Sequence, residues 1–122
     1  LLLCCGKVYY DLLARREETG ADDTALVRVE QLCPFPKDQL RRILGSYGSV
    51  REIIWVQEEH KNQGAWVFFD EHFSEVFPEI ELRYLGRPEN AGTATGRGRQ
   101  HREEQETLMK QAFSDGRGVR HQ

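Results

Sequence analysis

The chain has few cysteines, and their number and spacing indicate no disulfide framework. Its three cysteines are Cys4, Cys5 and Cys33. An odd count without a Cys-x-x-Cys spacing indicates neither a disulfide framework nor a zinc site. Cys4 and Cys5 lie in an apolar run, where cysteine usually behaves as a small buried hydrophobic residue. We therefore expect a reducing compartment and no redox role for these thiols.

Long hydrophobic runs and an excess of positive charge are also missing. No apolar run approaches the roughly 20 residues that span a bilayer, and the apolar segment at residues 1–5 is too short for a signal peptide. The formal net charge of the 122-residue chain is -3, whereas nucleic-acid surfaces need clustered Lys and Arg. We expect a soluble single domain with neither a membrane nor a nucleic-acid partner.

What the chain does have is a regular alternation of strand-like and helix-like segments. The strand-like segments are residues 1–5, 24–30, 50–56 and 81–85, and the helix-like segments are residues 7–18, 36–47, 66–77 and 102–113. Each crossover is long enough for a right-handed βαβ unit. The pattern predicts an α/β fold, a three-layer sandwich with a mostly parallel sheet over residues 1–113. Residues 114–122 have no periodicity, and we expect a disordered tail there.

The junction over residues 55–66 is the most informative segment. An apolar strand ends in Glu58 and Glu59, and the chain then turns through Asn62 and Gly64 into a helix that begins at Trp66. In a parallel sheet this junction lies at the carboxyl edge, where ligands and partners bind. Charged side chains are rarely buried without partners. The two acids therefore need donors or water, and the alternative is that they are exposed loop acids.

The third helical segment carries more apolar residues than one helix face can hold. Trp66, Val67, Phe68 and Phe69 are consecutive, so at least one of Val67 and Phe68 must point away from the main apolar stripe. An outward apolar residue at this position predicts a second packing surface for a neighbouring domain or subunit.

No motif marks a self-contained active site. Residues 86–100 combine glycines and arginines, which could bind a phosphate. Neither Gly-x-Gly-x-x-Gly nor a P-loop pattern is present, and a solvated connector is the alternative. His60, His72 and His101 have no metal-ligand spacing, and no Gly-x-Ser-x-Gly sequence exists. We predict no catalytic, cofactor-binding or metal-binding residue within the chain.

Several segments together resemble a known family. They are Leu3-Cys4-Cys5-Gly6-Lys7-Val8-Tyr9-Tyr10-Asp11-Leu12, Val29-Glu30-Gln31-Leu32-Cys33-Pro34-Phe35-Pro36, Gln57-Glu58-Glu59-His60-Lys61-Asn62-Gln63-Gly64 and Tyr84-Leu85-Gly86-Arg87-Pro88. Ala94-Thr95-Gly96, His101 and Glu104-Gln105 continue the match in the same order. Over residues 1–113 the chain resembles the C-terminal domain of the decarboxylating first component of 2-oxoglutarate dehydrogenase. Cys5 and Thr93 are small departures from the family pattern.

The resemblance implies a specific parent enzyme. Such enzymes are oxidoreductases of the tricarboxylic acid cycle that decarboxylate 2-oxoglutarate and pass the succinyl group to the lipoyl arm of a succinyltransferase in a multienzyme complex. They are homodimers, and their two preceding domains hold thiamine diphosphate and magnesium. On this basis we expect an N-terminally truncated fragment, inactive alone and without bound cofactor. Its fold would be transketolase-like, with strand order 2-1-3-4 and an antiparallel strand before Leu1.

The resemblance also suggests roles for residues near the sheet edge. It implies a domain or dimer interface formed by Glu58, Glu59, Asn62, Gln63, Gly64 and Trp66. Counter-ions or effector ligands would come from Lys7, Arg83, Arg87, Arg97 and His101. Two alternatives stay open: a 2-oxoadipate dehydrogenase of lysine breakdown, and a module that binds a nucleotide or acetyl-coenzyme A effector. The expected location is the mitochondrial matrix for a eukaryotic source and the cytoplasm for a bacterial one.

Overall fold

Four parallel strands form the centre of the molecule. The computed structural model describes residues 1–48, 50, 52–87 and 98–114. Its elements are, in chain order, β1 (Leu2–Cys4), α1 (Val8–Thr19), β2 (Leu26–Arg28), α2 (Lys37–Ser46), β3 (Ile53–His60), α3 (Trp66–Val76), β4 (Leu82–Arg87) and α4 (Gly98–Ser114). The sheet order is β2-β1-β3-β4 with all pairs parallel, which confirms the predicted order.

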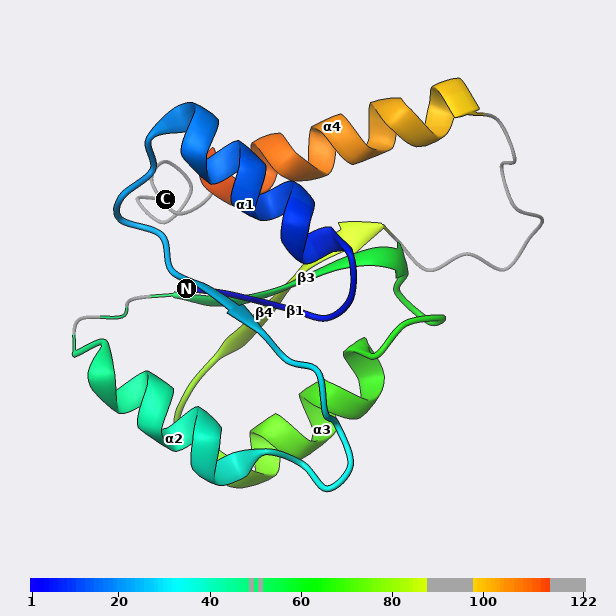
Figure 1. Ribbon diagram of the computed structural model, residues 1–122. Helices are drawn as coiled ribbons and strands as arrows, with labels where there is room; N and C mark the ends of the chain where they lie inside the picture. The colour runs from blue at the N-terminus through cyan, green and yellow to red at the C-terminus, as the bar shows by residue number, and fades with distance from the viewer. Residues whose placement is uncertain (49, 51, 88–97, 115–122) are drawn as a thin grey trace.

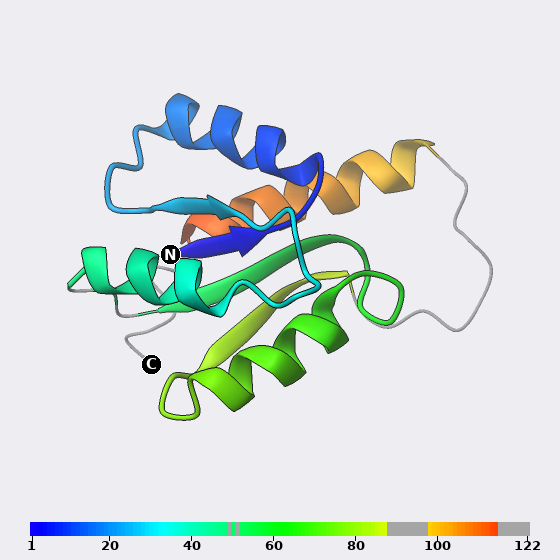
Figure 2. The same ribbon diagram turned by 60° about the horizontal axis from the view of Figure 1, so that its bottom comes forward.

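Helices cover both faces of this sheet and complete three layers. Helices α1 and α4 lie side by side on one face, and α2 and α3 cover the other (Figures 1 and 2). Alternate residues of a strand point to opposite faces, so Ile54 and Val56 pack toward α1 and α4 while Ile53 and Trp55 pack toward α2 and α3. Burial on both faces explains the continuous apolar run in β3.

The layer beneath α3 has an aromatic core. The ring of Trp55 stacks on Phe69 with centroids 4.3 Å apart, and Phe69, Phe73 and Phe77 follow one another along the helix at 5.6 and 4.9 Å. Residues four apart lie on the same side of a helix, so this spacing forms one stripe. The stripe anchors the start of α3 against the middle of the sheet, and thereby fixes where the preceding turn lies.

The thiols agree with the expectation that the first two cysteines act as small apolar groups. All three cysteines are free. Cys4 is fully buried, and burial, more than the nearby charges, raises the pKa of its thiol to about 12. Burial also raises the pKa of the half-buried Cys5 thiol, with smaller contributions from the negative charges of Glu30 and Glu59.

Three of the differences from the predicted boundaries concern the carboxyl side of the sheet. Strand β3 continues to His60, so the two acids predicted to follow the strand lie within it. Strand β4 continues to Arg87, which places Gly86 and Arg87 in the sheet and outside the predicted loop. Helix α4 begins at Gly98, four residues earlier than predicted. A register irregularity between Gln57 and His60 allows β3 and β4 to stay paired beyond the apolar run.

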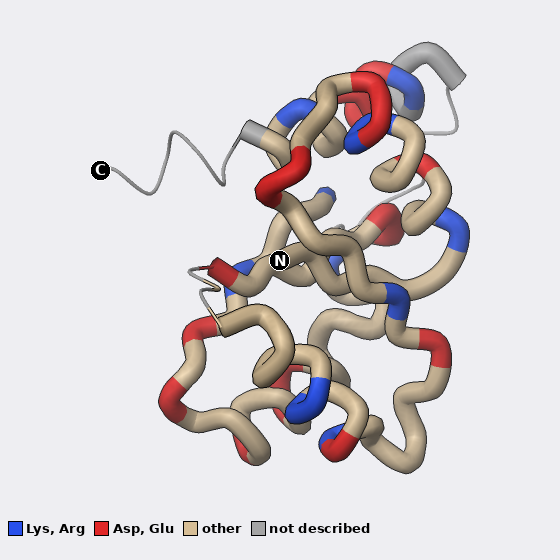
Figure 3. The backbone as a smooth tube through the Cα atoms, turned by 60° about the vertical axis from the view of Figure 1, so that its left-hand side comes forward, with Lys and Arg blue, Asp and Glu red and all other residues tan. Residues whose placement is uncertain are grey.

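Charged residues lie mainly on the helical layers and the turns. Acidic and basic positions are interspersed along both layers (Figure 3). Within the described part of the chain, no helix is both long enough and apolar enough to cross a membrane. Of the predicted loop at residues 86–100, residues 88–97 lie outside the described residues, and so do residues 115–122 of the predicted tail at residues 114–122. Ser114, the first residue of that tail, is the last residue of α4.

Two neighbouring phenylalanines on α3 provide a matched test of this packing. Phe69 is fully buried, whereas the next residue, Phe68, is 37% exposed. We expect Phe69→Ala to lower the free energy of unfolding by about 3–5 kcal/mol because it leaves a cavity under the helix. The same change at Phe68 should lower it by about 1 kcal/mol or less. Urea unfolding followed by circular dichroism measures both, and equal losses would contradict the assigned helix face.

Candidate functional site

A buried glutamine lies at the centre of the carboxyl-edge junction. The Gln57 side chain accepts two hydrogen bonds at Oε1, from Trp55 Nε1 and from the backbone N–H of Trp66, both at 3.0 Å. Its Nε2 donates to the carbonyl oxygens of His60 at 2.9 Å and Glu59 at 3.3 Å. Gln57 is only 3% exposed. These four hydrogen bonds give a partner to each N–H of its side-chain amide and two partners to its amide oxygen.

Two glycines make room for this arrangement. A Cβ added at Gly64 would lie 2.4 Å from Cδ of Gln57, and one at Gly86 would lie 2.6 Å from the backbone oxygen of Gln57. Neither glycine has a positive φ, in contrast to Gly6 and Gly20. Glycine is therefore required at position 64 because the Gln57 amide lies so close to its backbone. An unusual backbone conformation does not explain the requirement.

The two adjacent acids point to different environments because they alternate along β3. The Glu58 carboxylate lies 3.3 Å from Lys7 Nζ at the start of α1, with side chains 12% and 80% exposed, respectively. Lys7 is thus one of the predicted counter-ions that the structure does bring to an acid. Glu59 is exposed. The pKa of Tyr84 is raised to about 12, mainly by burial and further by the negative charge of Glu59.

The turn after β3 has exposed polar side chains, and packed aromatic rings support it from below. Asn62 and Gln63 are exposed, and Trp66 is half-buried. The Trp66 ring packs against Tyr84 with centroids 5.1 Å apart, and Lys61 Nζ lies 5.2 Å from the centre of the same Tyr84 ring. The structure therefore gathers the six predicted interface residues into one strand end and turn. Gln57 and Tyr84, which the sequence analysis did not select, support them.

An exposed apolar surface adjoins this turn. Val67 is 61% exposed and Phe68 37% exposed, which confirms that the start of α3 has apolar side chains off its main stripe. The Phe68 ring stacks on His72 at 4.1 Å, and His72 in turn lies 5.6 Å from Phe35. We call these four residues the α3 patch. It extends the turn into a surface that combines polar and apolar groups.

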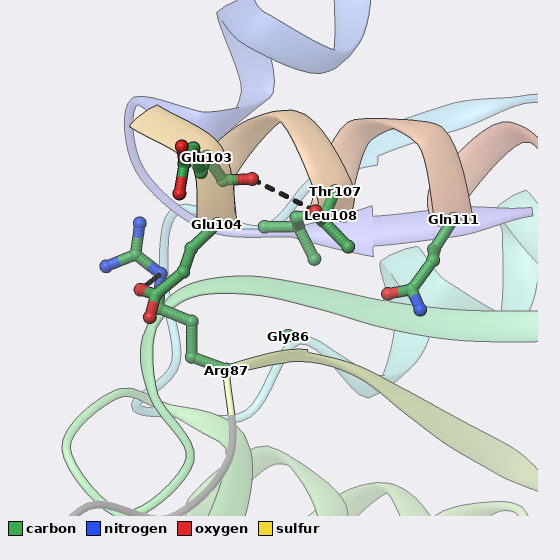
Figure 4. A pocket seen from close by; sticks show the side chains of 7 residues that line it. All are labelled: Gly86, Arg87, Glu103, Glu104, Thr107, Leu108 and Gln111. Carbon is green, nitrogen blue, oxygen red and sulfur yellow. Dashed lines mark hydrogen bonds and ion pairs between the residues drawn. The ribbon is translucent and has the colours of Figure 1, made fainter. Parts of the chain in front are cut away.

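Arg87 lies at a second place, between β4 and α4. An open pocket of about 250 Å³ is lined by residues of β4 and α4, and Figure 4 shows Arg87 and Glu104 pointing toward each other at one end of it. Arg87 Nε is 3.5 Å from Glu104 Oε1, and its guanidinium donates to Gln105 Oε1 at 3.4 Å. Gln105 donates in turn to Asp11 on α1 at 3.0 Å. These contacts tie Arg87 to the α1 and α4 layer.

The other predicted cationic residues do not gather in one site. Arg83 forms an ion pair with Glu52 near the amino end of the sheet. Arg97 lies outside the described residues, and the structure describes the backbone of His101 in α4 but not its side chain. Lys7 and Arg87 lie at the carboxyl edge of the sheet, each beside an acid, whereas Arg83 lies near the amino end, so the three do not form a common anion site.

The described residues also offer no fit for a metal centre. None of them forms a group of three or more His, Cys, Asp or Glu side chains that could hold a metal ion. Magnesium is usually bound through carboxylates together with the phosphates of its cofactor. We therefore derive no step of chemistry through a metal or a diphosphate cofactor within this part of the chain.

The contact between Gly64 and Gln57 can be tested by a double-mutant cycle. We expect Gly64→Ala to lower the free energy of unfolding by about 2 kcal/mol, because the new methyl group overlaps the Gln57 amide. In a Gln57→Ala background the same change should have little further effect, which gives a coupling of about 1–3 kcal/mol. Gly45→Ala is the control, since a Cβ at Gly45 meets no atom within 4 Å. Additive losses at positions 57 and 64 would contradict the contact.

Comparisons with known proteins match this domain along almost its whole length. The family model described as "2-oxoglutarate dehydrogenase C-terminal" matches residues 1–113. The 2-oxoglutarate dehydrogenase E1 component of Azotobacter vinelandii is 43% identical over 118 residues, covering 93% of this chain and 12% of the relative. The Cupriavidus necator E1 component is 42% identical over 97% of this chain, and the Corynebacterium glutamicum E1/E2 component is 39% identical over 93%. The chain thus spans only 9–12% of the length of these relatives. The predicted relationship is confirmed: the chain belongs to the 2-oxoglutarate dehydrogenase C-terminal family.

Proposed function

We propose that this chain is the C-terminal assembly domain of a 2-oxoglutarate dehydrogenase E1 component. Its task is to pack against the preceding domains and the dimer mate through the turn after β3 and the α3 patch. The observation that carries the proposal is the exposure of Val67 and Phe68 directly beside the polar turn. A soluble monomer gains nothing from this arrangement, whereas an apolar centre with a polar rim is typical of protein interfaces.

The physical properties of the turn support an interface role. Glu59, Asn62 and Gln63 offer one carboxylate and two amides to a partner, and all three are exposed. The hydrogen bonds of Gln57 and the packing of Trp66 hold the backbone beneath them. A surface that is ordered before it binds loses less conformational entropy on association, which favours affinity.

The activity of the whole enzyme is part of the proposal, and the names of the relatives support it as a 2-oxoglutarate dehydrogenase. The complete polypeptide would oxidatively decarboxylate 2-oxoglutarate and transfer the succinyl group to a lipoyl-bearing succinyltransferase component in the tricarboxylic acid cycle. Thiamine diphosphate and magnesium would be held by domains that precede this one. We place the enzyme in the mitochondrial matrix if its source is eukaryotic and in the cytoplasm if it is bacterial.

The alternatives receive no support. An effector-binding module would need its cationic residues in one site, yet Arg83 lies at the opposite end of the sheet from Lys7 and Arg87, and each of the three has an acidic partner. A 2-oxoadipate dehydrogenase would belong to the same family, but the relatives compared above are named for 2-oxoglutarate.

The test uses the full-length polypeptide with single substitutions at the proposed interface. We expect Val67→Glu and Glu59→Ala each to weaken dimer association about tenfold or more, because the first places a charge in the buried centre and the second removes a partner from a polar contact. Tyr47→Glu is the control, since Tyr47 is 45% exposed and lies beyond the opposite end of the sheet. Sedimentation velocity measures association.

A second measurement addresses catalysis. The isolated chain should release no carbon dioxide from 2-oxoglutarate, even with thiamine diphosphate and magnesium added. Wild-type association of both interface variants, or decarboxylation by the isolated chain, would overturn the proposal.

A further inference from the structure

We infer that Gln57 is a positioning residue for the interface: its amide sets where the turn and the start of α3 lie, and so controls association in addition to supporting the fold. This inference rests on the proposed function and deepens it. Gln57 cannot contact a partner protein itself, because only 3% of it is exposed. It would act through the residues that flank it on the surface.

The four hydrogen bonds of Gln57 join the core to both ends of the turn. Oε1 links the ring of Trp55, which lies in the aromatic core, to the backbone N–H of Trp66 at the start of α3. Nε2 holds the carbonyl oxygens of Glu59 and His60, the last residues of β3. The first N–H groups of a helix have no partner within the helix, and Ala65 at the N-cap has no side chain that could supply one. Gln57 supplies that partner from the strand.

The amide supplies partners that no apolar side chain could supply. Gln57 is the one buried polar side chain among the residues whose burial the structure describes, and it contacts the ring nitrogen of Trp55 and the backbone N–H of Trp66. An apolar side chain of similar size could fill the same space, but it would leave these donors and the two carbonyl oxygens without this partner, at a cost in stability for each group that stays buried. What an apolar side chain could not do is hold the two carbonyl groups and the helix N–H in their present directions.

The segment that the amide holds is the proposed binding surface. Between His60 and Trp66 lie the exposed Asn62 and Gln63, and directly after Trp66 come the exposed Val67 and Phe68. If the hydrogen bonds of the Gln57 side-chain amide are lost, the end of β3 and the start of α3 are no longer fixed to each other. The polar turn and the α3 patch would then stop presenting one continuous surface.

A single substitution can make this positioning depend on pH. Gln57→Glu keeps the size of the side chain, but its ionised form cannot donate to the carbonyl oxygens of Glu59 and His60, whereas its protonated form can donate to one of them. Burial beside two carbonyl groups should raise the pKa of the introduced carboxyl above the ordinary value, although the N–H groups of Trp55 and Trp66 favour the ionised form and reduce this rise. Other titratable or charged groups around it are Glu58, Glu59 and His60 on β3, Lys61 in the turn, and Tyr84 and Arg87 on β4.

The experiment measures dimer association of the full-length Gln57→Glu enzyme across pH, relative to wild type at each pH. A carboxyl whose pKa is raised in the folded state is best tolerated at low pH and disturbs the structure as it ionises. We expect association about tenfold weaker than wild type near roughly pH 8.5, recovering to within about threefold near roughly pH 5.5. Gln39→Glu, the same change at an exposed position of α2, should show no such pH profile.

Hydrogen exchange on the same samples separates positioning from loss of the fold. The amides of β1 and of the first half of β3 should stay protected in Gln57→Glu at both pH values, while those of residues 58–67 exchange faster at the higher pH. Wild-type association of Gln57→Glu at the higher pH would overturn the inference. Weaker association accompanied by loss of protection in β1 would also overturn it, because the role would then be structural only.

Failure of the positioning role and failure of the proposed interface give different results. If Val67→Glu associates as wild type does, the interface itself is misplaced and the proposed function fails. If Val67→Glu dissociates the dimer while Gln57→Glu does not, the interface stands and only the positioning role fails.

Discussion

The carboxyl edge of this domain depends on one side-chain amide. Parallel strands end at the same edge of a sheet, and the loops that follow them carry its functional groups. A loop left to itself is mobile, since few of its atoms are packed. Here Gln57 ties the end of β3 and the start of α3 to the aromatic core through its two acceptor and two donor contacts. Gly64 and Gly86 leave the space that this amide and its backbone occupy. The result is an ordered turn whose outer side chains stay available to a partner.

The two sides of the sheet contribute differently to this edge. On the α2 and α3 side, stacked aromatic rings from Trp55 to Phe77 fix the helix that presents the α3 patch. On the α1 and α4 side, polar contacts close the layer: Lys7 with Glu58, Arg15 with Glu106, and Gln105 between Arg87 and Asp11. Exposed ion pairs contribute little stability individually. The Arg15–Glu106 and Gln105–Asp11 contacts join α1 to α4 around the apolar core that packs both helices on the strands.

The alternation of apolar segments was sufficient to predict the helices and strands, because the central strands are buried between two helical layers. The sheet order was predicted from the family resemblance, since the alternation alone does not say which strands are neighbours. The alternation was insufficient at the strand ends. Strand β3 continues past Glu58 and Glu59 because pairing with β4 resumes at His60, opposite Arg87, after a register irregularity, and backbone hydrogen bonds leave no trace in side-chain polarity. Gln57 was overlooked because a single polar residue after an apolar run resembles the end of a strand. The contact of Arg87 with Glu104 joins residues that are distant in the sequence, and a local pattern does not contain that information.

A structure of the full-length enzyme tests the central claim most directly. In the domain alone, Val67 is 61% and Phe68 37% exposed, beside a turn whose acidic and amide side chains face solvent. We predict that in the assembled enzyme these two residues and Glu59 are covered by a preceding domain or by the dimer mate. Finding the same side chains still exposed to solvent, with the turn after β3 touching no other part of the assembly, would contradict the account.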